Sequence, residues 1–358
     1  MAKLTLKPGV VTGNQLDELF EYCKESECAL PAVNVIGSSS INAAIRAARE
    51  ANAPIIIQFS NGGSVFNAGK YFDNTDQKTA IAGGVAGAHH VRLVAEAHGV
   101  PVVLHTDHCA RKLLPWVDGL IKEGEAFYRQ NGVPLYSSHM LDLSEETLED
   151  NIAISKEYLE RLAGIDMYLE IELGVTGGEE DGVDNTEVDD SRLYTQPEDV
   201  LAAYDALTPV GRITVAASFG NTHGVYKPGN VKLRPEILKH SQAKIHRERK
   251  TPGSKPLSLV FHGGSGSSEA EIREAVSYGV IKFNIDTDTQ WAFTHPIKRY
   301  MDEHDACLQS QIGNPEGEDK PNKKYIDPRA WVVLGEKGMI ARLKEAFGHL
   351  NATDKFDF

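Results

Sequence analysis

Cysteine, long apolar runs and positive charge are all scarce in this chain of 358 residues. Four cysteines are too few for a disulfide framework in a chain of this length, which excludes a small disulfide-stabilised secreted domain and indicates a reducing environment. No apolar run approaches the roughly 20 residues of a membrane-spanning helix, and the first residues lack the apolar stretch of a signal peptide. We therefore expect a soluble, cytoplasmic protein without a membrane partner.

The shortage of positive charge bears on partners as well. The chain carries 37 Lys and Arg against 51 Asp and Glu, a formal net charge of −14. Nucleic-acid binding needs clustered basic side chains, so a nucleic-acid partner is excluded. What is present is ordinary globular composition, with 41% hydrophobic and 25% charged residues, in a chain long enough to bury a large core.

Short apolar runs alternate with helical patterns along most of the chain. Eight runs are typical of buried strands, at residues 31–36, 54–59, 101–105, 135–140, 167–172, 213–217, 257–261 and 280–285. Helical patterns lie between most of them, at residues 40–51, 81–98, 116–130, 144–163, 197–206 and 268–278. This alternation predicts a parallel sheet, and eight repeats fit a closed (β/α)8 TIM barrel, for which about 250 residues is typical. An open, doubly wound sheet is the alternative.

We expect a single barrel domain over residues 1–358, because neither a linker nor an internal repeat divides the chain. It would have an N-terminal helical segment at residues 1–30 and C-terminal helices with a polar arm, packed on the barrel, at residues 288–358. Three long insertions, at residues 61–78, 174–194 and 221–235, each follow a predicted strand. Loops of this length are usually functional, and barrel active sites lie at the same strand ends.

Polar side chains follow the predicted strands at the point where each one ends. In a barrel these ends meet at one mouth, so residues far apart in sequence become neighbours. The side chains concerned are Asn34, Ser60, Asp107 with His108, Asp142, Glu172, His223, His262, and Asn284 with Asp286.

Three of the thirteen histidines, His108, His223 and His262, stand one to a few residues beyond separate apolar runs. Three histidine ligands suit a catalytic Zn²⁺ that keeps one position open for substrate. The Cys109 thiol next to His108 is a possible fourth ligand, although a packed thiol is the better interpretation.

Carboxylates accompany these histidines. Strand 167–172 alternates so that Glu170 and Glu172 point into the barrel, where a carboxylate needs a partner. Glu172 and Asp142 would hold a second divalent cation or orient the histidines. For the deeper Glu170 we expect a buried pair with Lys282.

Two glycine-rich or polar turns are candidates for binding phosphate. Residues 261–267, Phe-His-Gly-Gly-Ser-Gly-Ser, lead into a helix that starts near Ser268, with Glu271 at capping-box spacing. A similar turn, residues 284–287, follows the eighth strand, and the loops after strands seven and eight form the common phosphate site of such barrels. The acidic loop 176–182, with Glu179 and Glu180 between glycines, is a candidate lid that delivers a base.

Together these stretches resemble class II, metal-dependent fructose-bisphosphate aldolases of the longer (type A) subgroup. The similar segments are residues 58–63, 105–112, 137–146, 170–182, 218–228, 261–267, 284–290 and 321–329. The resemblance implies reversible cleavage of fructose 1,6-bisphosphate to dihydroxyacetone phosphate and glyceraldehyde 3-phosphate, in glycolysis and gluconeogenesis.

The resemblance also implies roles for individual residues. His108, His223 and His262 would bind the catalytic zinc, and Asp142 and Glu172 would serve a second metal position. Asp107 and Glu180 would transfer the protons of the reaction.

The substrate's phosphates would have their own contacts. Arg329 would reach one phosphate, in dimers from the neighbouring subunit, and a monovalent cation, Na⁺ or K⁺, would assist near the other. We therefore expect a homodimer with sugar bisphosphate and triose phosphates as ligands. The remaining substrate-binding residues would be Asn34, Ser60, Gly224, Gly263, Gly264, Ser265, Asn284, Ile285, Asp286 and Thr287.

Several alternatives stay open at this stage. A Schiff-base aldolase would use Lys282, which lies on an inward face two residues below the mouth. A tagatose-bisphosphate aldolase would share the mechanism and differ at one stereocentre. The third alternative is an inactive barrel that serves as a scaffold. The fourth is a zinc hydrolase.

Overall fold

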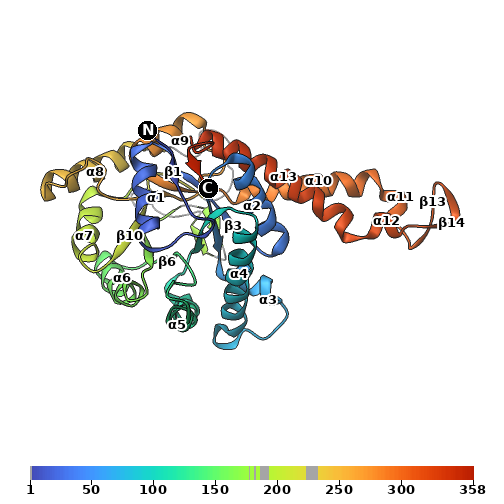
Figure 1. Ribbon diagram of the computed structural model, residues 1–358, viewed down its shortest axis with the longest axis horizontal. Coiled ribbons are helices and arrows are strands. Elements are labelled where there is room, and N and C mark those ends of the chain that lie inside the picture. Colours follow the sequence, from blue (N-terminus) through green and yellow to red (C-terminus); the bar gives the residue numbers. More distant parts are fainter. Residues whose placement is uncertain (1, 177, 181–182, 186–192, 223–232) are drawn as a thin grey trace.

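The computed structural model describes residues 2–176, 178–180, 183–185, 193–222 and 233–358, and in these residues it contains a closed parallel barrel surrounded by helices (Figure 1). The strands follow one another around the barrel in the order β5-β4-β3-β12-β11-β10-β7-β6, and a pairing of β6 with β5 closes it. Closure confirms the predicted (β/α)8 barrel and excludes the open sheet. The strands are β3 (Leu30–Asn34), β4 (Ile55–Phe59), β5 (Pro101–Thr106), β6 (Ser138–Leu141), β7 (Tyr168–Leu173), β10 (Arg212–Ala217), β11 (Leu259–Phe261) and β12 (Val280–Asn284).

The helices that cover the barrel match the predicted periodicities, with two additions. They are α2 (Ser38–Ala51), α4 (Lys78–Ala97), α5 (Leu114–Asn131), α6 (Leu148–Ala163), α7 (Pro197–Leu207) and α9 (Glu269–Ser277). The pattern did not predict α8 (Glu236–Arg249), because only Leu238 and Ile245 supply apolar burial in an otherwise polar segment. It also missed α3 (Asn61–Ala68), whose paired glycines are typical of a loop. The Ser60 hydroxyl starts α3 by accepting a hydrogen bond from the Gly63 backbone N–H at 3.1 Å.

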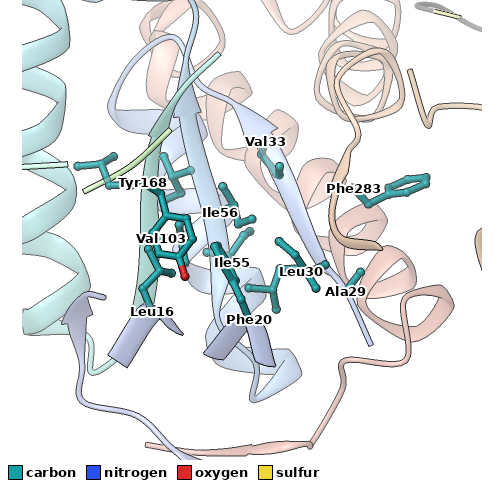
Figure 2. Close-up of a cluster of buried hydrophobic side chains, with 14 of the residues drawn as sticks. Leu16, Phe20, Ala29, Leu30, Val33, Ile55, Ile56, Val103, Tyr168 and Phe283 are labelled. Carbon is teal, nitrogen blue, oxygen red and sulfur yellow. The ribbon is translucent and has the colours of Figure 1, made fainter. Parts of the chain in front are cut away.

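Apolar side chains fill the amino-terminal end of the barrel (Figure 2). Helix α1 (Gly13–Glu25) packs Leu16 and Phe20 against the first residues of several strands, and the Phe20 ring meets the edge of Tyr168 with 5.2 Å between centroids. The short strand β2 (Gly9–Val10) pairs with the start of β5. The polar side chains of the barrel are therefore concentrated at the opposite, carboxyl-terminal end.

The C-terminal segment has a part against the barrel and a part that extends away from it. Helices α10 (Thr287–Glu303) and α13 (Pro328–His349) cross so closely that a Cβ on Gly338 would lie 2.1 Å from the Ala292 carbonyl oxygen. Met339, Leu343 and Phe347 of α13 are buried, and α13 packs along α2. The arm projects beyond these helices (Figure 1). It comprises α11 (Asp305–Leu308), the hairpin β13 (Ile312–Asn314) and β14 (Gly317–Pro321), and α12 (Lys323–Ile326).

The two chain ends lie side by side. Strand β1 (Leu4–Thr5) pairs in parallel with β15 (Phe356–Asp357).

Among the described residues, no helix is both long and apolar enough to cross a membrane.

A buried histidine within β6 should make the fold sensitive to acid. His139 hydrogen-bonds the Thr106 hydroxyl at 2.8 Å, and burial lowers its pKa to about 3. Between pH 6.5 and pH 3 the unfolded chain binds a proton at this site that the folded protein does not, so the free energy of unfolding falls as the pH falls. This one site should account for a loss of about 2 kcal/mol between pH 7.5 and pH 5.

Replacement of this histidine by asparagine, His139→Asn, keeps a polar atom near the Nδ1 position and removes the titration. Denaturant unfolding of the metal-free proteins at pH 7.5 and pH 5 measures the effect. Between pH 7.5 and pH 5, the free energy of unfolding of the wild type should decrease by about 2 kcal/mol more than that of the variant. Equal losses would show that His139 does not carry this acid sensitivity.

Candidate metal and catalytic site

Strand β5 delivers Asp107 and His108 to the mouth of the barrel. The strand ends at Thr106, and His108 adopts φ +43°, a left-handed conformation that is uncommon for a residue with a side chain. The His108 backbone N–H points at the Met140 sulfur, 3.3 Å away, on the neighbouring strand β6. Such backbone conformations persist where surrounding contacts hold them, and they concentrate at functional sites.

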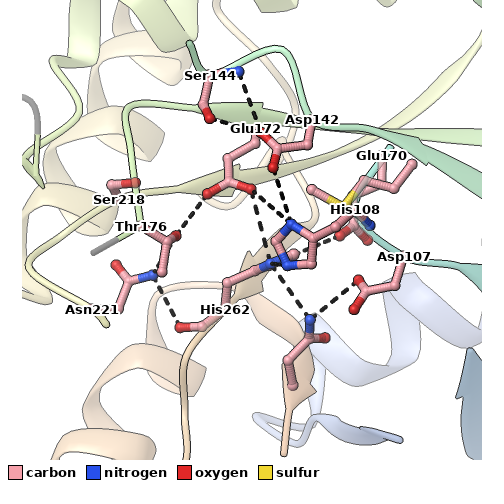
Figure 3. Close-up of polar contacts among 12 residues, drawn as sticks. Asp107, His108, Asp142, Ser144, Glu170, Glu172, Thr176, Ser218, Asn221 and His262 are labelled. Atoms are coloured by element: carbon pink, nitrogen blue, oxygen red, sulfur yellow. Dashed lines mark hydrogen bonds and ion pairs between the residues drawn. The ribbon is translucent and has the colours of Figure 1, made fainter. Parts of the chain in front are cut away.

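Two histidines from opposite parts of the sequence face each other at this mouth (Figure 3). His108 Nε2 and His262 Nδ1 lie 3.0 Å apart. The other nitrogen of each ring meets a carboxylate, with His108 Nδ1 at 3.1 Å from Asp142 and His262 Nε2 at 2.8 Å from Glu170. Because an ionised carboxylate only accepts hydrogen bonds, each ring carries its proton on the carboxylate side and turns a lone pair toward the other ring. A cation between the rings would stabilise this arrangement.

Glu172 completes the cluster from β7. One of its oxygens accepts a hydrogen bond from the Thr176 hydroxyl at 2.6 Å. The other lies 3.8 Å from His108 Nδ1 and 3.9 Å from His262 Nδ1, and it is buried without a hydrogen bond from any residue that the structure describes. Burial and then the nearby Asp142 raise the pKa of Glu172 to about 8, against the opposing effect of His108. A divalent cation here would favour the ionised carboxylate.

These residues fit a zinc ion. Two nitrogen ligands of one tetrahedral zinc lie about 3.3 Å apart, close to the observed separation of the two rings. The groups that could hold a metal include His108 with Asp142 and Glu172, and Asp107 with His108 and His262. Cys109 is fully buried and belongs to none of the groups of described residues that could hold a metal, which favours the interpretation as a packed thiol.

Asp107 is held as an anion beside these ligands. Burial favours its protonated form, but His108, Lys282 and His262 outweigh that effect and lower its pKa to about 2. Gln58 donates to one carboxylate oxygen at 2.8 Å and Asn284 to the other at 3.3 Å. An ionised, oriented carboxylate of this kind can accept a proton from a substrate hydroxyl.

Below Asp107 the predicted pair of Glu170 and Lys282 is confirmed. Lys282 Nζ lies 2.8 and 3.0 Å from the two oxygens of Glu170 and 3.8 Å from Asp107. Both side chains are buried. An ammonium group held by two carboxylates is a poor nucleophile, which argues against Lys282 as a Schiff-base residue.

A cavity of about 860 Å³ opens beside the cluster, lined by Asn34, Ser60 and Asp286 among others. The Asn34 side chain also hydrogen-bonds Asp107, so the cavity wall adjoins the proposed acid–base residue. The predicted capping box is present, because Ser268 and Glu271 exchange hydrogen bonds at the start of α9. In the turn before it, Gly264 lies so close to the Phe283 ring that a Cβ would be 2.3 Å from it.

The second predicted phosphate turn follows β12. The Ile285 side chain is buried in the core and its N–H donates to the Ala32 carbonyl, so the residue offers no side chain to a ligand. Thr287 begins α10, and Asp288 donates its backbone N–H to the Ser265 hydroxyl at 3.3 Å. This hydrogen bond joins the turns after β11 and β12 into one surface.

Four of the predicted site residues are not among those that the structure brings together at the barrel mouth. Arg329 stands near the start of α13, where its side chain is 90% exposed and pairs with Asp327. The backbone of Glu180 belongs to the short strand β8 (Gly178–Glu180), and its side chain is outside the described atoms. His223 and Gly224 lie outside the described residues.

Some supporting residues were missed by sequence reasoning. Gln58 was given no role, although a lone amide within the apolar run Ile55–Phe59 was a usable signal. Asn221 donates to the His262 carbonyl at 3.0 Å and to the Thr176 hydroxyl at 3.2 Å. No pattern in the sequence marks such a contact, because it depends on how the loops after three strands meet.

Comparisons with known proteins agree with this geometry. The family model described as fructose-bisphosphate aldolase class-II matches residues 14–355. The class 2 fructose-bisphosphate aldolase of Escherichia coli K12 and the fructose-bisphosphate aldolase of Edwardsiella ictaluri are each 57% identical, over 98% of both chains.

Solved structures give the same result. The crystal structure of fructose-bisphosphate aldolase from Campylobacter jejuni superposes with a TM-score of 0.88 at 54% identity, over 98% of both chains. The YdjI aldolase of Escherichia coli K12 has a TM-score of 0.66 at 21% identity, over 96% of this chain and 98% of that one, and this likeness shows the fold alone. The chain therefore belongs to the class II fructose-bisphosphate aldolase family, a family of metal-dependent lyases.

Proposed function

We propose that this protein cleaves fructose 1,6-bisphosphate reversibly to dihydroxyacetone phosphate and glyceraldehyde 3-phosphate, as a zinc-dependent step of glycolysis and gluconeogenesis in the cytoplasm. The observation that carries the proposal is the pair of imidazole nitrogens 3.0 Å apart, backed by carboxylates and adjoining the anionic Asp107. The 57% identity to relatives named for this activity, over 98% of both chains, supports the proposal.

His108 and His262, with His223, would hold the zinc, and Asp142 and Glu172 would orient them or hold a second divalent cation. Such a cation supplies Lewis-acid stabilisation of the negative charge that develops on the substrate's C2 oxygen. Glu172, with one buried oxygen aimed at both rings, is the carboxylate best placed to adapt to a cation there.

Two carboxylates of this chain would move the protons. In cleavage, Asp107 accepts the proton of the C4 hydroxyl, the C3–C4 bond breaks, and C4 leaves as the aldehyde carbon of glyceraldehyde 3-phosphate. The electron pair stays on C3 and is delocalised toward the C2 oxygen. Glu180 then protonates C3, which yields dihydroxyacetone phosphate. Condensation runs through the same transfers in reverse.

The two turns after β11 and β12 would hold the ketose phosphate, with a monovalent cation, Na⁺ or K⁺, beside it. The groups concerned are Ser60, Gly224, Gly263, Gly264, Ser265 and residues 284–287. Asn34 would bind substrate where it adjoins Asp107. In a homodimer, Arg329 of a second copy would reach the other phosphate, which suits the exposure of its side chain at the start of α13.

The test is a coupled triose-phosphate assay with zinc titrated into metal-free protein. We expect turnover of fructose 1,6-bisphosphate that rises with zinc occupancy, and a much lower kcat/KM for tagatose 1,6-bisphosphate. The reverse preference would favour the tagatose-bisphosphate alternative. Absence of turnover with both epimers at full metal occupancy would contradict the proposed function.

A further inference from the structure

We propose that Glu170, supported by Lys282, is a positioning residue that makes Nδ1 the metal-binding nitrogen of His262. The inference rests on the proposed metal site. It concerns two buried groups of the barrel interior to which the proposed reaction assigns no role.

Glu170 reaches His262 from the middle of β7, directly below the facing imidazoles. Its Oε1 atom lies 2.8 Å from His262 Nε2, and both side chains are almost completely buried. Water cannot replace the carboxylate at this depth, so the hydrogen bond determines which ring nitrogen is protonated.

The surroundings of the opposite nitrogen agree with this tautomer. Asn284 Nδ2 lies 3.5 Å from His262 Nδ1 and donates a hydrogen bond to the Asp107 carboxylate, which identifies that atom as the amide nitrogen. A donor group on this side of the ring favours an unprotonated Nδ1. His262 thus presents a lone pair at Nδ1, the atom that faces His108.

The two ligands are oriented by different carboxylates and in opposite senses. Asp142 meets Nδ1 of His108 at 3.1 Å, so His108 presents Nε2, whereas Glu170 meets Nε2 of His262, so His262 presents Nδ1. Carboxylate partners of this kind fix the orientation of metal-binding histidines and increase their basicity. Glu170 therefore does for His262 what Asp142 does for His108.

Lys282 has a separate task in this arrangement. His105, Asp107 and Glu170 have ligand atoms close enough to hold a metal of their own, deeper in the barrel. The Lys282 ammonium group lies at 2.8 Å from Glu170 and 3.8 Å from Asp107, and it supplies the positive charge that this cluster needs. With this charge in place, Glu170 stays available to His262, and the metal binds between His108 and His262 instead of at the deeper cluster.

The experiment compares zinc binding by the wild type, Glu170→Gln, the double variant Glu170→Gln/Lys282→Met, and Thr214→Val. The double variant removes both charges together, so it avoids a buried unpaired ammonium if the single variant does not fold. Thr214 is the matched control, because its hydroxyl contacts the other oxygen of Glu170 at 3.4 Å without touching His262. Zinc affinity is measured by competition with a chromophoric chelator, and the ligand field by the visible spectrum of the cobalt(II) protein.

We expect zinc affinity to fall about 10- to 100-fold in Glu170→Gln and in the double variant, with an altered cobalt spectrum. Thr214→Val should stay within about threefold of the wild type with an unchanged spectrum. Wild-type affinity and spectrum in either Glu170 variant, or an equal loss in Thr214→Val, would overturn the positioning role and leave the proposed function standing. Failure of the wild type itself to bind zinc would overturn both.

Discussion

Removal of divalent metal should abolish cleavage of fructose 1,6-bisphosphate, lowering the rate by roughly 10³-fold or more. Stabilisation of the charge on the C2 oxygen lowers the activation free energy by several kcal/mol. Each 1.36 kcal/mol of activation free energy corresponds to a tenfold change in rate. Without the cation, no described side chain at the mouth supplies an equivalent positive charge, because Lys282 lies below and is paired with Glu170. Chelation followed by the coupled assay measures the effect.

One control separates loss of metal from loss of structure, and a second tests for a Schiff base. Zinc added back to the chelated protein should restore the rate. Treatment with borohydride in the presence of substrate should leave the protein unmodified. His108→Ala should bind zinc weakly and stay inactive at zinc concentrations that saturate the wild type. Full activity of metal-free protein, or trapping of substrate on Lys282, would require the Schiff-base mechanism instead.

The barrel was predictable because each strand is a short apolar run between helical patterns. All eight runs became strands, since in a parallel barrel one face of each strand packs on helices and the other fills the interior. Helix α8 escaped prediction because its buried stripe includes Ser241 and Gln242. Gln242 donates to the Leu257 carbonyl at 2.7 Å, so a polar side chain does the packing that periodicity assigns to apolar ones.

The site was predictable to the extent that it lies at strand ends. Asp107, His108, Asp142, Glu172, His262 and Asn284 lie at or just beyond the carboxyl ends of five strands, and closure of the barrel brings them together. Alternation along β7 also predicted that Glu170 faces Lys282. The hydrogen bond from His262 to Glu170 was not predictable, because it depends on the relative heights of β7 and β11, which are not neighbours in the barrel.

Replacement of Asp107 by alanine should abolish cleavage while zinc binding is retained, with a fall in kcat of about 10²- to 10⁴-fold. The carboxylate is anionic, is oriented by Gln58 and Asn284, and adjoins the cavity through Asn34. No other described carboxylate has this combination, since Glu170 is paired with Lys282 and Glu172 is directed at the histidines. Steady-state cleavage and zinc content, measured on the same sample, test the prediction.

Asp107→Asn provides the matched control, because the amide keeps the shape of the side chain and loses its capacity to accept a proton as a base. If Asp107 acts in proton transfer, the asparagine variant should be as inactive as the alanine variant, with zinc affinity near that of the wild type. His108→Ala should give the opposite division, with loss of metal as the cause of inactivity. Equal loss of zinc in the Asp107 and His108 variants would mean that Asp107 serves mainly to hold the metal, and the proton would then have to be assigned to another group.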